Sequence, residues 1–312
     1  MNVFAAVTDQ DWFDYLSLRP DLDEVNFWTP KPWGGEFRVL NRGELLLFKL
    51  KSPYNAIAGG GFFEHYTELP VSLAWAAFGE KNGAGSYEAA RERISRLRHE
   101  KPKPWDDYEI GSIVLVEPFF WPRERWIPQP RDWRSTIVRG KTYDLGTEIG
   151  RELWREILLR MEAHRPSGVA DSWQNPEIPG GYGDPTAHPQ RIGQGTFRIV
   201  VTDAYQRRCA VTRERALPVL DAAHIRPFSV EPRHYVSNGI LLRSDVHRLF
   251  ETGYVTVTPQ YRAEVSRRIR EDFDDGESYL KLHGTAIHLP SRQDWRPDPE
   301  ILAWHNEHRF RG

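Results

Sequence analysis

Residues 221–253, DAAHIRPFSVEPRHYVSNGILLRSDVHRLFETG, constrain the fold of this 312-residue chain more than any other stretch. An apolar strand precedes Pro227, a polar loop follows, and residues 240–242 predict a second strand. Ser244 supplies a side-chain oxygen where a helix would begin, and Gly253 stands where that helix would end. The stretch therefore predicts a strand, a loop, a strand and a helix, which is a ββα unit.

The same stretch carries side chains suited to breaking a phosphodiester bond. His224 lies in the first strand, Asn238 at the end of the loop, and His247 in the first turn of the helix. A neutral imidazole is well matched to accepting a proton near neutral pH. Strand alternation separates Asp221 from His224. This leaves Asp221 and His247 as candidate metal ligands, His224 as candidate general base, and Asn238 to hold the loop around it.

The order and spacing of these residues resemble the HNH, or ββα-metal, endonucleases that carry a D-A-A-H-I-x-P signature followed by N-G-x-x-L-R-x-D-x-H-x-L-F. The resemblance implies that His224 is the general base, that Asn238 orients it, and that His247 binds a metal ion. Many such enzymes have a second metal ligand immediately before the base, where this chain has Ala223. We expect Asp221 to take that part. The implied cofactor is a divalent ion, Mg²⁺ or Mn²⁺ first.

The composition is that of an ordinary globular protein, with 39% hydrophobic and 28% charged residues. At roughly 100–200 residues per domain, the length favours two domains. There is no apolar run of about 18 residues and no secretory-type N-terminus, so we expect a cytoplasmic protein without a membrane span. The single cysteine, Cys209, excludes the paired-cysteine zinc clamp that supports many HNH domains.

Charge is distributed unevenly along the chain. Residues 191–312 contain 19 Lys and Arg against 16 Asp and Glu, and 18 of the 19 cations are arginines. Arginine suits bidentate contact with phosphate. We therefore consider Arg226, Arg243 and Arg248 as phosphate-binding candidates, with pairing to local carboxylates as an equally weighted alternative for each.

Residues 1–165 predict a mixed α/β domain built on a curved sheet. Strands are expected at 2–7, 45–50 and 110–121, and helices at 11–18, 69–79, 86–98 and 145–164. Residues 166–195 are rich in Pro and Gly without periodicity, which predicts a linker. Residues 196–312 complete the nuclease domain, so the expected fold class is α+β.

The first domain also resembles a known family. The stretches VFAAVTDQDWFDYLSL, VNFWTP, FKLKSPYNAIAGGGFF and IGSIVLVEPFFW resemble EVE-like domains of the PUA superfamily, relatives of readers of modified cytosine. This resemblance implies recognition of a modified base that is flipped out of the duplex into an aromatic pocket. Extrusion of a base costs a few kcal/mol, and stacking on an aromatic ring returns roughly 1–3 kcal/mol. The candidates for this pocket are Asn26, Trp28, Trp33, Phe62 and Phe120.

The sequence thus predicts a modification-dependent DNA endonuclease that binds 5-methylcytosine or 5-hydroxymethylcytosine in duplex DNA and cuts nearby. One ββα centre cuts one strand, so double-strand cleavage implies two protomers, as a homodimer or a transient pair. Two alternatives stay open. In the first, the nuclease acts on RNA or unmodified DNA and the first domain is structural. In the second, the protein binds modified nucleic acid without cutting it.

Overall fold

The computed structural model describes residues 2–19, 21–35, 37–99, 102–103, 105–162, 193–227, 229–230 and 235–312. The chain divides into two compact units, Met1–Pro189 and Gln190–Gly312. Most of the expected linker at 166–195 lies outside the described residues. Helix α5 already begins at Gln194, so the last two residues of that range are helical.

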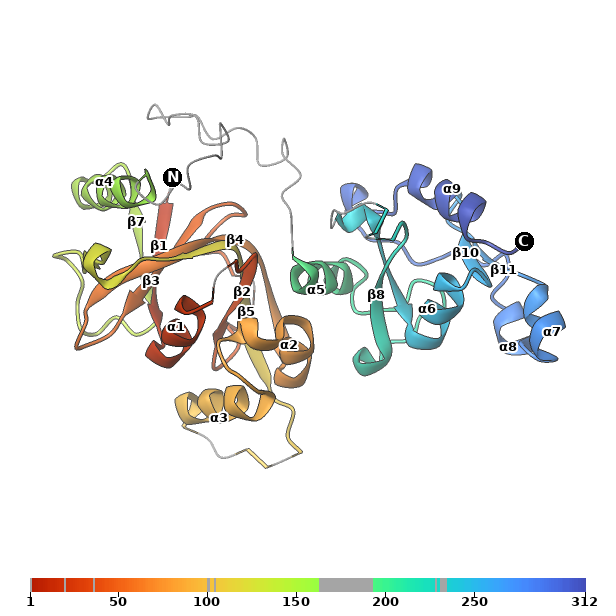
Figure 1. The fold of residues 1–312 in the computed structure, drawn as a ribbon, viewed down its shortest axis with the longest axis horizontal. Helices are drawn as coiled ribbons and strands as arrows, with labels where there is room; N and C mark the ends of the chain where they lie inside the picture. Colours follow the sequence, from red (N-terminus) through yellow and green to blue (C-terminus); the bar gives the residue numbers. More distant parts are fainter. Residues whose placement is uncertain are drawn as a thin grey trace. The chain divides into compact units, whose positions relative to one another are not determined.

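The first unit is built on a seven-stranded sheet with the order β2-β5-β4-β3-β1-β7, and β6 pairs with β4 (Figure 1). Strands β1 and β3 are parallel, and the other pairs are antiparallel. The strands are β1 (Asn2–Thr8), β2 (Glu24–Thr29), β3 (Leu45–Leu50), β4 (Ala56–Pro70), β5 (Glu109–Phe120), β6 (Ile127–Pro128) and β7 (Gly140–Asp144).

Four helices accompany this sheet, and each matches a helix that the sequence predicted. They are α1 (Gln10–Ser17), α2 (Val71–Phe78), α3 (Tyr87–Arg98) and α4 (Glu148–Glu162). Local chemistry explains two of the starts. The Asp9 carboxylate accepts the Trp12 N–H at 3.0 Å, and the Ser86 hydroxyl accepts the Ala89 N–H at 3.2 Å, so each cap satisfies a helix donor.

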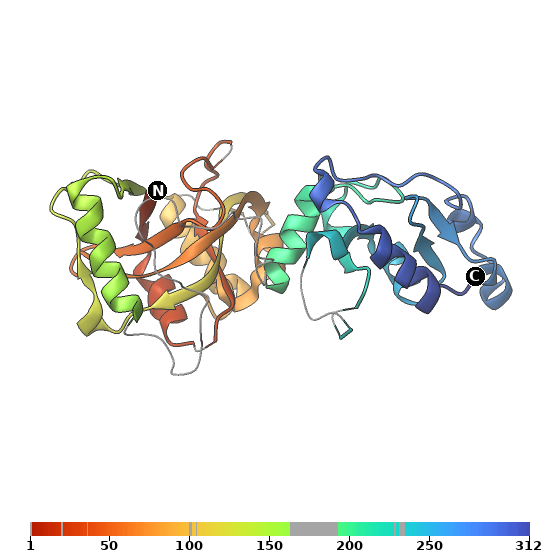
Figure 2. The same cartoon turned by 90° about the horizontal axis from the view of Figure 1, so that it is seen from above.

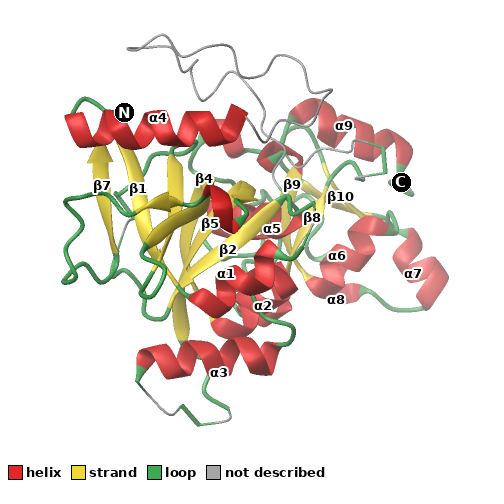
Figure 3. Ribbon diagram, turned by 60° about the vertical axis from the view of Figure 1, so that its left-hand side comes forward, coloured by secondary structure: helices red, strands yellow, loops and turns green. Residues whose placement is uncertain are grey.

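Apolar packing covers both faces of the sheet, with α4 on one side and α1 on the other (Figure 3). Leu153, Trp154 and Ile157 of α4 pack with strand residues such as Leu45 and Leu47. On the side of α1, five rings stack or meet edge to face at centroid distances of 5.2–6.4 Å: Trp12, Phe13, Phe27, Phe48 and Phe120. These rings fill the space between α1 and the sheet.

The glycines at 59–61 allow β4 to approach its neighbours closely. A Cβ at Gly59 would lie 2.2 Å from the carbonyl oxygen of Phe119, and one at Gly60 would lie 2.6 Å from that of Leu46. No side chain fits at such distances, so glycine is required there. The sequence predicted a tight backbone beside aromatic rings at this point, and the neighbouring ring is that of Phe119.

The second unit contains the predicted ββα element, with further helices and a second β-hairpin around it. The mixed α+β class is therefore confirmed. Its elements are α5 (Gln194–Ala204), β8 (Leu220–His224), β9 (Gly239–Arg243), α6 (Ser244–Glu251), β10 (Val255–Val257), β11 (Ala263–Val265), α7 (Arg268–Phe273), α8 (Glu277–Leu280) and α9 (Pro299–His308). Helices α5 and α6 lie on opposite sides of β8 (Figure 1). In the described part of the chain, no helix is long and apolar enough to cross a membrane.

Helix α9 is attached to this unit through a buried histidine and lies beside β10 (Figure 2). The His305 ring stacks on Phe250 of α6 with a centroid distance of 3.8 Å, and its Nδ1 lies 2.8 Å from the hydroxyl of Thr256. Burial lowers the pKa of His305 to about 4, so the ring is neutral at physiological pH. His305 is therefore a core residue that joins three elements.

Replacing Gly59 by alanine should separate β4 from β5. Because the added Cβ overlaps the Phe119 carbonyl, we expect the free energy of unfolding to fall by about 1–3 kcal/mol in chemical denaturation. Gly85→Ala is the matched control, since a Cβ there lies an ordinary 3.4 Å from the Tyr15 hydroxyl. Equal stability of the two variants would contradict the close-approach argument.

Candidate active site

The hairpin β8–β9 places the ends of the predicted loop together. His224 is the last residue of β8 and pairs with Gly239, the first residue of β9. The Ile225 N–H donates to the Asn238 carbonyl at 2.9 Å, which continues the ladder by one step. The loop between the two strands therefore begins and ends at the two residues expected to form the general base and its orienting amide.

The His224 ring lies flat on a phenyl ring from α5. The centroids of His224 and Phe197 are 3.9 Å apart and their planes differ by 7°. Gly239 makes this arrangement possible, because a Cβ at that position would lie 2.4 Å from Val201 and 3.1 Å from the Phe197 ring. The stacking restricts the imidazole to one plane. A general base needs such a fixed orientation, because it must accept a proton from a positioned water.

Asn238 holds the backbone just after His224. Its Oδ1 accepts the Arg226 N–H at 2.8 Å, and its Nδ2 donates to the Arg226 carbonyl at 3.0 Å. The residue is fully buried, so both bonds are made away from water. A side-chain amide that pairs with both the N–H and the carbonyl of one residue fixes the direction of the chain leaving β8.

Asp221 and His247 meet on the opposite side of β8, beside α6. His247 Nδ1 lies 3.5 Å from Asp221 Oδ2, and its Nε2 lies 3.3 Å from Glu251 Oε1. The His247 side chain is 20% exposed and that of Asp221 38%, so both remain accessible to an ion or a phosphate. The structure thus brings together the two residues that the sequence proposed as metal ligands.

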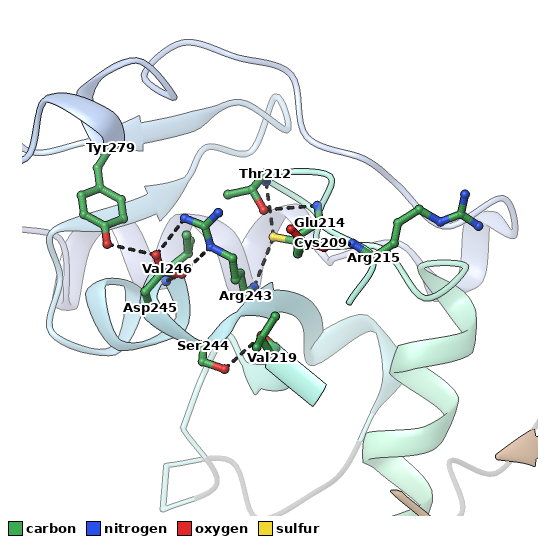
Figure 4. A network of polar contacts seen from close by, with 10 residues as sticks. All are labelled: Cys209, Thr212, Glu214, Arg215, Val219, Arg243, Ser244, Asp245, Val246 and Tyr279. Atoms are coloured by element: carbon green, nitrogen blue, oxygen red, sulfur yellow. Dashed lines mark hydrogen bonds and ion pairs between the residues drawn. The ribbon is translucent and has the colours of Figure 1, made fainter. Parts of the chain in front are cut away.

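A polar network fixes the junction between β9 and α6 (Figure 4). Arg243 donates twice to Asp245, at 2.6 and 2.8 Å, and the Tyr279 hydroxyl donates to the same carboxylate at 3.0 Å. The Arg243 guanidinium, with Tyr279 and the Val246 N–H, lowers the pKa of Asp245 to about 2. Arg243, a predicted phosphate contact, is therefore engaged by a carboxylate at the start of the helix that carries His247.

The single cysteine supports the same junction. Cys209 is fully buried, and its Sγ accepts backbone N–H groups from Thr212 at 3.3 Å and Arg243 at 3.2 Å (Figure 4). The Ala210 N–H donates to the Leu241 carbonyl at 2.7 Å. A turn held by sulfur-accepted hydrogen bonds thus packs against β9 without a second cysteine.

The other two arginine candidates differ in their surroundings. The guanidinium carbon of Arg226 lies 5.4 Å from the ring centroid of Trp304 on α9, a cation–π distance. Arg248 is exposed on α6, one residue after His247, and its side chain makes no ion pair with any described residue. Arg248 is therefore available to a phosphate approaching the Asp221–His247 pair.

Three of the five residues expected to line a base pocket lie in the interior of the first unit. Asn26 is fully buried, and its Nδ2 donates to Asn82 at 2.9 Å and to Ser112 at 3.3 Å, while its Oδ1 has no partner among the described residues. The buried Trp28 indole donates to the Asn82 carbonyl at 2.9 Å. Phe62 belongs to the core beneath α4.

The remaining two are partly exposed. Phe120 is surrounded by rings of the α1 core. The Trp33 ring meets Phe37 edge to face at 5.1 Å, and the Arg139 guanidinium lies 4.8 Å from the Trp33 ring centroid. Among the rings predicted to line the base pocket, Trp33 is thus the one whose face is covered by a charged group and not by a core residue.

Residues 209–258 match the HNH endonuclease family. Together with the site described above, this match identifies the second unit as an HNH endonuclease domain, a phosphodiester hydrolase that acts on nucleic acid.

Two solved structures resemble the chain at low identity. ASCH from Zymomonas mobilis is 9% identical with a TM-score of 0.33, over 49% of this chain and 94% of that one. The modification-dependent TagI restriction endonuclease is 12% identical with a TM-score of 0.27, over 99% of this chain and 81% of that one. No curated protein matches the chain.

HNH nucleases typically use a divalent metal ion, and the donor set beside α6 fits one. Asp221 supplies a carboxylate and His247 an imidazole, ligands that Mg²⁺, Mn²⁺ and other first-row ions accept. No group of three or more His, Cys, Asp or Glu side chains with metal-binding geometry occurs among the described residues. Two protein ligands would leave other coordination positions to water and a substrate phosphate, as is common for Mg²⁺ in proteins.

Several residues around the centre carry no signal in the sequence. Phe197 lies outside the ββα stretch and shares no motif with His224, and Trp304 is far along the chain from Arg226. Tyr279, which donates to Asp245 from α8, is likewise distant from it in the sequence. Glu251 is the exception, because a residue four positions after His247 on a helix faces the same side.

Removing the Asp245 carboxylate should destabilise the second unit in a pH-dependent way. Because the folded pKa is about 2 against an ordinary 3.8, the stabilisation is present above about pH 4 and is lost as pH falls toward 2. We expect Asp245→Asn to lower the free energy of unfolding at pH 7 by about 1 kcal/mol, reduced by solvent screening of a side chain that is 39% exposed.

Denaturant unfolding from pH 7 to pH 2 measures this effect. Asp294→Asn is the control, since its ion pair with Arg292 is 62% exposed on the carboxylate side and should contribute about 0–0.5 kcal/mol. A difference between wild type and Asp245→Asn that is as large at pH 2 as at pH 7 would refute the ion-pair explanation.

Metal binding can be tested apart from cleavage. We expect Asp221→Asn and His247→Ala each to weaken Mn²⁺ binding by about 10-fold or more, measured by electron paramagnetic resonance of free Mn²⁺. Asp274→Asn, an exposed carboxylate beyond α7, serves as the control. Wild-type affinity in both site variants would show that the ion binds elsewhere.

Proposed function

We propose that the protein is a modification-dependent DNA endonuclease, in which the first unit binds a flipped 5-methylcytosine or 5-hydroxymethylcytosine and the second cuts a nearby phosphodiester bond. The observation that carries the nuclease half is the arrangement around β8. His224 is clamped by Phe197 on one side, and the Asp221–His247 pair lies on the other.

In the proposed reaction, His224 accepts a proton from the attacking water while Phe197 and the Asn238-bound backbone hold its ring in place. Asp221 and His247 would hold a divalent ion, which would supply charge neutralisation for the phosphate and its leaving oxygen. Arg248 binds a neighbouring phosphate, because its guanidinium is exposed beside His247. We also assign phosphate binding to Arg226 and Arg243. Arg226 would bind a phosphate while its guanidinium remains over the Trp304 ring. Arg243 would bind one while it still donates to Asp245.

Two features support the proposed recognition of a modified base by the first unit. They are its EVE-like motifs and its partly exposed aromatic rings. Trp33 carries a guanidinium rather than core side chains over one face, which suits exchange for a base. The TagI enzyme, with which the chain shares a low overall similarity, is itself described as modification-dependent. A single ββα centre per chain further implies that double-strand cleavage requires two protomers.

One cleavage experiment tests both halves. Duplexes of one sequence carrying plain, 5-methyl- or 5-hydroxymethylcytosine are incubated with the protein and Mg²⁺ or Mn²⁺. We expect cutting of the modified duplexes and loss of about 10²–10⁴-fold in rate for His224→Ala, because general base catalysis is removed. His99→Asn, an exposed histidine in the first unit, should cut as wild type does.

The outcomes separate the two halves. Equal cutting of all three duplexes would remove the reader and favour a nuclease for unmodified DNA. Wild-type nicking by His224→Ala would overturn the assignment of the general base.

A further inference from the structure

The first unit contains a lysine whose stem is buried and whose ammonium group lies beside an aromatic ring. Lys49 lies in β3 and is 4% exposed, yet among the described residues no carboxylate or other oxygen is placed to accept a hydrogen bond from its ammonium group. Burial lowers the pKa of Lys49, and the nearby Lys51 adds to this effect. The Lys49 ammonium keeps contact with solvent at the end of a buried stem. Lysines with a lowered pKa are frequent at functional sites.

The group that does contact Lys49 is an aromatic ring. The Lys49 Nζ lies 4.8 Å from the ring centroid of Trp133, which is half-buried and packs at the edge of the core beneath α4. The turn that bears this ring is held in place. The neighbouring Asp132 accepts from Lys141 at 2.5 Å and from the Tyr143 hydroxyl at 3.1 Å, both on β7.

We propose that Lys49 and Trp133 form the site that holds the flipped base, with the base stacked on the indole and its acceptor edge on the Lys49 ammonium. This inference rests on the proposed function and adds the residues that recognise the pyrimidine. Cytosine carries adjacent acceptors at O2 and N3, away from its 5-position. Lys49 therefore reads the cytosine ring, and another part of the site senses the 5-substituent.

The charges near this pair favour a base over a phosphate group. The ammonium of Lys141 is already paired with Asp132, so it is not available as a second cation to an anion at Lys49. A phosphate is usually bound by several donors and gains nothing from an indole face. A planar heterocycle gains both the stacking on Trp133 and a charge-assisted hydrogen bond from Lys49.

Binding in the presence of EDTA tests the proposal with the full-length protein. Three duplexes of one sequence carry 5-methylcytosine, plain cytosine or an abasic site at one position. We expect Lys49→Met to weaken binding of the 5-methylcytosine duplex by about 10- to 100-fold and to leave the abasic duplex within about 3-fold of wild type. Lys51→Met, an exposed lysine two residues on, should weaken all three duplexes equally and slightly.

Ring variants provide a second measurement. Trp133→Ala should lose about 10-fold or more on the 5-methylcytosine duplex, and Trp133→Phe should recover most of it by keeping a stacking face. Thermal unfolding checks the fold, and Lys49→Met should stay close to wild type in stability because methionine keeps the apolar stem that packs in β3.

Each unfavourable outcome has its own meaning. Equal losses for Lys49→Met on the modified and abasic duplexes would show a phosphate contact and overturn the base assignment. Loss in Trp33→Ala but not in Trp133→Ala would place the base on Trp33 instead. A wild-type protein without preference for modified over plain cytosine would refute the proposed function, while the comparison with the abasic duplex would still test Lys49.

Discussion

The register of β8 against β9 is the constraint on which the nuclease unit depends. His224 pairs with Gly239 and Asp221 with Leu242, so a slip of one residue would move both functional side chains to the wrong side of the hairpin. Gly239 protects this register, because any larger residue there would collide with Val201 and Phe197. The same glycine thereby leaves room for the phenyl ring that stacks on His224.

Two sets of polar contacts then hold the ends of the hairpin. Asn238 satisfies both backbone groups of Arg226 at the loop, and the Cys209 thiol and the Arg243–Asp245 pair hold the entry to α6. All of these contacts are within one unit and use no second cysteine. Sulfur-accepted hydrogen bonds and a buried amide therefore support the hairpin in a chain that has a single cysteine.

The first unit distributes its polar groups differently. Most of its aromatic rings pack in the core on both faces of the sheet. The number of aromatic residues alone therefore says little about a ligand site. Lys49 over Trp133 and Trp33 beneath Arg139 instead pair a cation with a ring that is not fully buried in the core.

The sequence by itself determined the elements that depend on local pattern: the ββα order, the helices at 11–18 and 86–98, and the tight glycines at 59–61. Periodicity, caps and turn residues act over a few positions, so they are readable without a fold. Tertiary structure alone decided that Phe197 stacks on His224, that Tyr279 reaches Asp245, and that Lys49 is buried against Trp133. These contacts join residues 27 to 84 positions apart, and no local pattern encodes which distant side chains will meet when sheets and helices pack.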